Sequence, residues 1–209
     1  MTAARPPNPW GDRRRRRIGL LGGSFNPAHD GHRHVSLLAL RELGLDEVWW
    51  LVSPQNPLKP VRGMAPQSER LAHAQAVAGH PAIRASDIET ALGTRYTADT
   101  LAVLRRRFPA SRFVWLMGAD NLVQLPAWDR WQRIMDRVAV AVFDRSPYCY
   151  QALAGKAARR YRHRRSLSGR VGRLALTPPP VWAFLHQPRH PASATAIRQA
   201  RASETPIGA

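Results

Sequence analysis

Short apolar runs alternate with segments of helical periodicity along nearly the whole chain, and this alternation is what most restricts its fold. The apolar runs predict strands at 18–21, 48–52, 82–85, 112–117, 138–143 and 181–185. The spacing of apolar residues between them predicts helices at 32–43, 68–78, 98–108, 128–136, 150–165 and 194–202. Strands that alternate with helices build βαβ units. The sequence therefore predicts an α/β fold, a doubly wound parallel sheet with helices on both faces.

The length of 209 residues is typical of one domain, and the composition marks where that domain begins and ends. Prolines and arginines fill residues 1–17, which we expect to form a flexible basic arm. The single domain is predicted to span 18–202, and 203–209 to form a C-terminal tail.

The chain is strongly basic, with 32 Lys and Arg against 14 Asp and Glu, a formal net charge of +18. Such a balance favours anionic partners, and a basic nucleic-acid-binding protein is one interpretation. The charge is concentrated, however, in Arg13–Arg17 and in a second block at 159–165, and such blocks are usually solvated. Aromatic residues do not alternate with them as in a single-strand groove, so we expect no nucleic-acid partner.

Two features bear on the compartment. No apolar run approaches the roughly 20 residues that span a bilayer, so no membrane partner is expected. Cys149 is the single cysteine and cannot form a disulfide within the chain. Both features favour a cytoplasmic protein. The sequence does not decide between a monomer and a homo-oligomer.

The loop after the first predicted strand has the most unusual composition, GGSFNPAHDGH at 22–32. Gly22 and Gly23 lack side chains, so backbone amides there can approach a ligand closely. His29 and His32 lie three residues apart where the next helix begins, a position that attracts anions. Two alternatives remain open for this stretch: an ordinary turn, and a zinc site in which His34 joins the two histidines.

The same stretch resembles the signature of the nucleotidylyltransferase superfamily, with His-x-Gly-His at 29–32. The second signature, Ser-Ser-Thr-x-Ile-Arg, is matched near the C-terminus by SATAIR, where Ala194 replaces the middle serine. The resemblance implies a sheet of the Rossmann-like type. It also implies that ATP contacts Gly22, Gly23, Ser24, Phe25, His29, His32, Gly118, Asp120, Ser193, Thr195 and Arg198.

Three interior motifs resemble the bacterial nicotinate-nucleotide adenylyltransferases within that superfamily: NPLKP around Lys59, RYTADTL at 95–101 and MGADNLVQLPAWDRW at 117–131. The resemblance implies that nicotinate mononucleotide contacts Asn26, Lys59, Tyr96, Thr97 and Trp128. An indole such as that of Trp128 offers a face for a pyridine ring, although tryptophan is also often a packing residue. The catalytic residues implied are His29, His32, Lys59 and Arg198.

The reaction implied is adenylyl transfer from ATP to nicotinate mononucleotide, with release of pyrophosphate. The expected cofactor is Mg²⁺, held mainly by phosphates and water, with no metal site formed by the protein. Three alternatives remain: nicotinamide mononucleotide or phosphopantetheine as the acceptor, and a regulatory protein that binds ATP without turnover.

Overall fold

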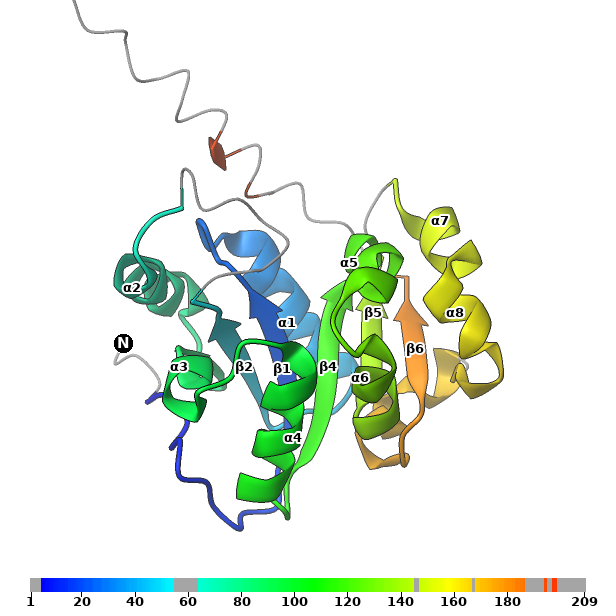
Figure 1. Cartoon of the computed structure of the whole chain (residues 1–209), viewed down its shortest axis with the longest axis horizontal. Helices are drawn as coiled ribbons and strands as arrows, with labels where there is room; N and C mark the ends of the chain where they lie inside the picture. The colour runs from blue at the N-terminus through cyan, green and yellow to red at the C-terminus, as the bar shows by residue number, and fades with distance from the viewer. Residues whose placement is uncertain are drawn as a thin grey trace, which may run out of the picture.

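The structure is a computed structural model that describes residues 5–54, 64–144, 147–166 and 168–186, together with residues 194, 197 and 198. Its centre is a sheet of six parallel strands in the order β3-β2-β1-β4-β5-β6 (Figure 1). The strands are β1 (Arg17–Gly23), β2 (Glu47–Val52), β3 (Ile83–Ser86), β4 (Arg112–Gly118), β5 (Ala139–Phe143) and β6 (Trp182–Leu185). This is the doubly wound order: β1, β2 and β3 follow one another toward one side of the sheet, and β4, β5 and β6 toward the other. The topological switch point therefore lies between β1 and β4. The predicted fold class is confirmed.

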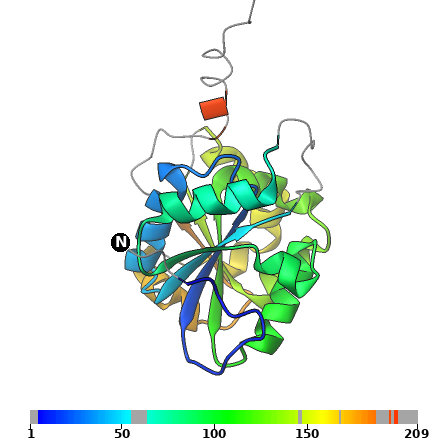
Figure 2. The same ribbon diagram turned by 90° about the vertical axis from the view of Figure 1, so that its left-hand side faces the viewer.

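Helices cover both faces of the sheet (Figure 2). One face packs against α1 (Asp30–Glu42), α2 (Gln67–Ala78) and the 3₁₀ segment η3 (Ser168–Leu176). The other packs against α3 (Ile88–Leu92), α4 (Thr97–Arg107), α5 (Ala119–Gln124), the 3₁₀ turn η1 (Leu125–Ala127), α6 (Trp131–Arg137), α7 (Cys149–Ala154) and α8 (Lys156–Arg160).

Strand β2 shows why the central strands are apolar without interruption. Trp49 and Leu51 pack into the core on one face, while Trp50 and Val52 pack into the core on the other. Successive side chains of a strand point to opposite faces, and here both faces are covered. A continuous apolar run is therefore required, in place of the apolar–polar alternation of a strand with one solvated face.

Every predicted strand is present, and its bounds are within two residues of the prediction, but several helices differ. The helix predicted at 150–165 is broken at Gly155, where an extended backbone separates α7 from α8, and it ends in the 3₁₀ turn η2 (Arg162–Arg164). The helix predicted from 128 starts at Trp131, because Arg130 has a left-handed backbone with φ of 49°. Helices α3 and α5 were not predicted, since five or six residues are too short for apolar periodicity. Of the helix predicted at 194–202, only Ala194, Ile197 and Arg198 are described, and all three are helical.

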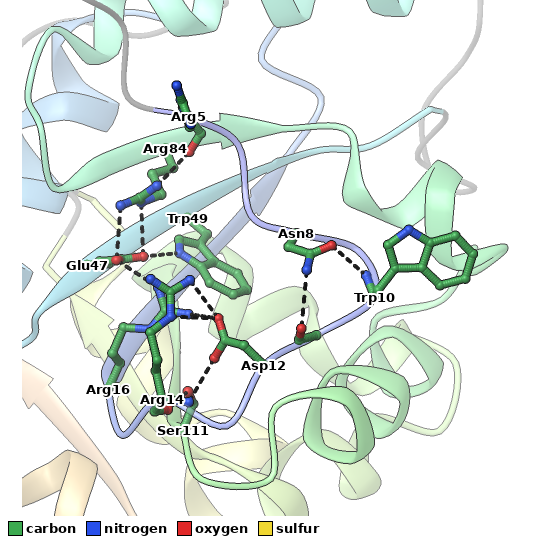
Figure 3. A network of polar contacts seen from close by, with 11 residues as sticks. Arg5, Asn8, Trp10, Asp12, Arg14, Arg16, Glu47, Trp49, Arg84 and Ser111 are labelled. Carbon is green, nitrogen blue, oxygen red and sulfur yellow. Dashed lines mark hydrogen bonds and ion pairs between the residues drawn. The ribbon is translucent and has the colours of Figure 1, made fainter.

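Residues 5–16 of the predicted basic arm lie against the domain (Figure 3). Arg16 has an exposed side-chain fraction of only 13% and pairs with Asp12 at 2.6 Å and with Glu47 at 2.8 Å. Glu47 also pairs with Arg84 and accepts a hydrogen bond from the Trp49 indole at 2.8 Å. The physical reason is the buried Glu47 carboxylate, whose charge requires nearby cations.

Backbone contacts hold the same segment further upstream. Arg84 donates to the carbonyl of Arg5 at 2.7 Å, and Arg107 donates to the carbonyl of Pro9. The boundary at residue 202 and the C-terminal tail lie outside the described residues. Among the described residues, no helix is both long and apolar enough to cross a bilayer.

Candidate functional site

The loop between β1 and α1 lies at the carboxyl edge of the sheet, at the topological switch point between β1 and β4. Ligands of doubly wound folds bind at this place. Phe25 turns the loop with a positive φ of 47°, a conformation that L-residues rarely adopt. Its ring is buried and lies 5.2 Å from Trp50 and 4.7 Å from His32, measured between ring centroids. The Phe25 side chain thus packs in the core, and its predicted contact with ATP stays a prediction.

The two histidines of the loop are held by backbone amides. The amide of Gly31 donates to Nδ1 of His29 at 3.1 Å, and the amide of His29 donates to Nδ1 of His32 at 3.2 Å. The rings lie 3.9 Å apart, and together these contacts form a capping box at the start of α1. A ring nitrogen that accepts a hydrogen bond carries no proton, so the neutral rings are protonated at Nε2. Each ring then presents Nε2 as a donor suited to a phosphate oxygen.

A relay of hydrogen bonds fixes α1 beneath these rings. The Ser36 hydroxyl donates to the carbonyl of His32 at 2.8 Å and accepts from the indole of Trp50 at 2.7 Å. Ser36 and Trp50 are fully buried, so the relay connects His32 to the core of the sheet. His32 therefore sits on a rigid support, which a positioned donor requires.

The two glycines of the loop differ in whether the structure requires glycine at their positions. A Cβ on Gly22 would lie 2.5 Å from the Trp115 ring, so packing against β4 requires glycine there. A Cβ on Gly23 would lie 3.5 Å from Phe25, an ordinary contact. The prediction that Gly22 and Gly23 contact ATP stays a prediction, but the requirement at Gly22 comes from Trp115.

Arg70 in α2 is a residue that the sequence interpretation missed. It is 3% exposed, and its guanidinium donates to four carbonyls: Ser24 at 2.6 Å, Ala65 at 2.8 Å, Ser53 at 2.9 Å and Pro54 at 3.1 Å. Burial lowers the pKa of this guanidinium from its usual value. An arginine in a helix is usually solvated, so its sequence context did not suggest burial. The one available signal of its burial was its place on the same side of α2 as Ala74 and Ala78.

The contacts of Arg70 connect three segments of the site. Ser24 belongs to the loop after β1, Ser53 and Pro54 follow β2, and Ala65 precedes α2. Lys59 lies between Pro54 and Ala65 but outside the described residues. Arg70 therefore fixes both ends of the Lys59 segment to the loop that carries the histidines.

The C-terminal signature reaches the first loop through Arg198. Its guanidinium donates to the carbonyl of Asn26 at 2.6 Å, across 172 positions of sequence. Ser193 and Thr195 of the same signature lie outside the described residues. The structure thus brings together the two signatures that the sequence separates most widely.

At the end of β4, Gly118 and Asp120 occupy the neighbouring position on the same edge. Gly118 has an extended backbone and precedes α5, and Asp120 lies in the first turn of that helix. Parallel strands β1 and β4 are adjacent, so their carboxyl ends meet here. This placement agrees with the predicted roles of Gly118 and Asp120, which stay predictions.

The motifs predicted to hold the acceptor are joined by an ion pair. Arg130 binds Asp99 through two hydrogen bonds of 2.9 and 2.7 Å, and its guanidinium lies 5.8 Å from the ring of Tyr96. Tyr96 precedes Thr97, the first residue of α4.

Trp128 is half-buried and meets Trp115 edge-on, with 6.3 Å between the ring centroids. Trp115 thus contacts Trp128 and lies against Gly22, which connects the acceptor motif to the first loop.

A buried carboxyl lies close behind the Tyr96–Thr97 motif. Glu89 in α3 is 7% exposed and accepts a hydrogen bond from the Thr100 hydroxyl at 3.0 Å. Burial raises its pKa from 4.5 to about 7, and the Thr100 hydrogen bond opposes that shift. The sequence interpretation gave this residue no role, because an isolated glutamate shows no sign of burial.

The zinc alternative placed His34 beside His29 and His32. Within the described part of the chain, no three His, Cys, Asp or Glu side chains are grouped so as to hold a metal ion. The Nδ1 atoms of His29 and His32 accept from backbone amides instead.

The sheet order and the loop at its switch point define an α/β protein of the doubly wound class, and the paired histidines there are donors suited to phosphate. The chain matches the family described as cytidylyltransferase-like over residues 20–200, and it belongs to that family.

Named relatives narrow the comparison. A probable nicotinate-nucleotide adenylyltransferase from Parvibaculum lavamentivorans is 54% identical over 183 residues, which cover 88% of this chain and 91% of that protein. A protein with the same name from Methylorubrum extorquens strain PA1 is 50% identical over 182 residues, which cover 87% of this chain and 98% of the relative.

A solved structure agrees on the fold. The nicotinic acid mononucleotide adenylyltransferase of Plasmodium falciparum, complexed with NaAD, superimposes with a TM-score of 0.65 at 16% identity. The superposition covers 88% of this chain and 83% of that one.

Proposed function

We propose that this chain transfers the adenylyl group of ATP to nicotinate mononucleotide, giving nicotinate adenine dinucleotide and pyrophosphate, a step of NAD biosynthesis. The observation that carries the proposal is the 2.6 Å hydrogen bond from Arg198 to Asn26, because it joins the two phosphate signatures at one edge of the sheet. The names of relatives that are about half identical support the choice of acceptor.

In the proposed reaction a 5′-phosphate oxygen of the mononucleotide attacks the α-phosphorus of ATP. A new P–O bond forms, the bond from the α-phosphorus to the β-phosphate bridging oxygen breaks, and pyrophosphate leaves with that electron pair. The nucleophile is already an anion, so no general base is required. Catalysis then consists of positioning and stabilisation of charge.

The proposed roles follow from the donors at this edge. His29 and His32 donate from Nε2 to phosphate oxygens and stabilise the charge that develops at the α-phosphoryl group. Arg198 and Lys59 supply positive charge to the phosphates. Ser193 and Thr195 add hydroxyl donors for the β- and γ-phosphates.

The acceptor would lie beside the Trp128 loop. The indole face of Trp128 suits the pyridine ring, and backbone amides near Tyr96 and Thr97 suit its carboxylate. The Arg130–Asp99 ion pair holds these two segments at a fixed separation. That arrangement supports a preformed acceptor pocket.

Magnesium is the proposed cofactor. The loop after β1 offers N–H donors, which complement phosphate oxygens and do not ligate a cation. The ion would therefore be held by phosphate oxygens and water, where it neutralises phosphate charge.

Cys149 is the single cysteine, which fits the reducing cytoplasm where we expect the reaction to occur.

The test is pyrophosphate release by the purified full chain with ATP and Mg²⁺, with nicotinate or nicotinamide mononucleotide as the acceptor. We expect release with the nicotinate compound at a kcat/KM at least about tenfold above that with nicotinamide, because amide donors favour a carboxylate. A preference for nicotinamide would reassign the acceptor. No release with either acceptor would contradict the proposed activity.

A further inference from the structure

A hollow lies at the edge of the sheet opposite the candidate site, next to the amino ends of β1, β4 and β5. It has a volume of about 840 Å³ and is lined in part by Arg15, Arg105, Arg112 and Arg137. Figure 1 places this edge at the bottom, where α4 ends and β4 begins. The histidines lie at the other end of β1, so this basic cleft is separate from the candidate active site.

The charge of the basic cleft is only partly neutralised. Arg17 pairs with Asp46 at 2.8 Å, and Arg16 pairs with Asp12 and Glu47 (Figure 3). The side chains of Arg15, Arg105 and Arg112 are exposed and form no ion pair with any described residue.

Arg137 adds a fourth cation without a carboxylate partner among the described residues, since its guanidinium donates to the carbonyl of Ala98 at 2.8 Å. Arg105 and Arg137 also line a neighbouring hollow of about 640 Å³. Four arginines, from the segment before β1 and from α4, β4 and α6, thus line one region in which they have no carboxylate partner among the described residues.

The lining also has hydroxyl groups and an apolar part. Ser111 and Thr177 contribute hydroxyls, which donate to the carbonyls of Arg14 and Arg173 at 3.0 Å each. Phe113, Val138 and Pro179 contribute apolar atoms. The volume falls in the range of about 300–1,000 Å³ typical of small-molecule sites. Guanidinium groups bind phosphate through paired charge-assisted hydrogen bonds.

We infer that the basic cleft binds an oligophosphate of nucleotide size, with two or more phosphate groups on the arginines. Its source is a nucleotide or an inorganic polyphosphate. The concave shape favours such a ligand over single-stranded nucleic acid, because Phe113 is only 6% exposed and offers no ring for base stacking. Arg15 lies before residue 20, where the family match begins, so the cleft extends beyond the matched region.

The test is calorimetric titration of the full chain with MgATP, and separately with inorganic tripolyphosphate, at about 0.15 M salt, where surface attraction is screened. The cleft variant is R15A/R105A/R112A. The matched control is R159A/R162A/R164A, which removes the same charge from exposed arginines outside the cleft lining. The substituted side chains of the cleft variant are exposed, so we expect it to fold normally.

We expect two MgATP binding events per unchanged chain and per control chain. In the cleft variant one of them weakens at least about tenfold, because three phosphate-binding cations are lost. A His32→Ala chain retains the cleft event, so failure of the proposed active site would not remove it. Equal cleft binding of tripolyphosphate would identify an inorganic source, and binding of MgATP alone a nucleotide source.

Three results would overturn the inference: one MgATP event in the unchanged chain with no cleft binding of tripolyphosphate, equal weakening in both triple variants, or a cleft that binds a single-stranded RNA 12-mer but neither small phosphate.

Discussion

The two edges of the sheet use positive charge in opposite ways. At the carboxyl edge, the buried Arg70 donates to four carbonyls. The groups assigned to phosphate there are the two histidines, together with Lys59, Arg198 and the hydroxyls of the C-terminal signature. At the amino edge, Arg15, Arg105 and Arg112 are exposed and pair with no described carboxylate. These exposed arginines therefore lie away from the edge with the candidate chemistry.

Net charge is a poor guide to a reactive site. Exposed cations attract anions over a Debye length and are screened by salt. Stabilisation of a transition state requires donors that are fixed before the reaction. The Ser36–Trp50 relay and Arg70 supply that rigidity only at the carboxyl edge.

The largest effect is expected from His32→Ala. Loss of a preorganised donor to a developing oxyanion costs about 10²–10³ in kcat. Pyrophosphate release measures it, and circular dichroism checks the fold. His73→Ala, an exposed histidine of α2, is the matched control. Near-normal turnover in folded His32→Ala would contradict the placement of the active site at the carboxyl edge.

Arg70→Met comes next. Four carbonyls lose their shared donor, so we expect the free energy of unfolding to fall by about 3 kcal/mol, with kcat reduced in the protein that still folds. Arg70→Lys should rescue little, because an ammonium lacks the planar fork. Chemical denaturation measures the loss, and Arg41→Met at an exposed pair should change stability by less than about 0.5 kcal/mol. Equal stability of the Met and wild-type chains would refute this role for Arg70.

Glu89→Gln tests the buried carboxyl behind the acceptor motif. In the folded chain the pKa of Glu89 is about 7, against 4.5 without burial, so between these values the folded chain binds more protons. Stability contributed by the protonated group is therefore lost as pH rises through this window.

Glutamine keeps an acceptor for Thr100 without the charge. At about 1.4 kcal/mol per pKa unit, we expect Gln to stabilise the fold by about 2–3 kcal/mol at pH 8 and little at pH 4. Denaturation at both pH values measures the difference, with the exposed Glu69→Gln as control. A gain that does not depend on pH would contradict the assignment to ionisation.

The smallest of these effects belongs to Trp128→Ala. Loss of the aromatic face should raise the KM for nicotinate mononucleotide about tenfold, because stacking on an aromatic side chain is worth about 1–3 kcal/mol. The KM for ATP should stay the same. Steady-state kinetics with each substrate varied separates the two, and a rise in the ATP KM alone would move Trp128 to the other substrate.

Much of the fold was predictable from local pattern. A strand such as β5, AVAVF, is apolar on both faces, and such a composition is typical of a parallel strand covered on both faces. Short or interrupted elements were not predictable: α3 has five residues, and Gly155 breaks a basic stretch whose composition suits one helix.

For the candidate site, the sequence determined which residue types are present and in what order: the histidines beside a glycine pair, and SATAIR far downstream. Tertiary structure alone decided that Arg198 reaches Asn26, that Gly22 faces Trp115 and that Arg70 is buried. It also decided that the arginine run lies against the domain, because Glu47 and its cations meet only after the strands have paired. Local periodicity records which side of an element is apolar, whereas contacts between distant segments depend on how the elements pack.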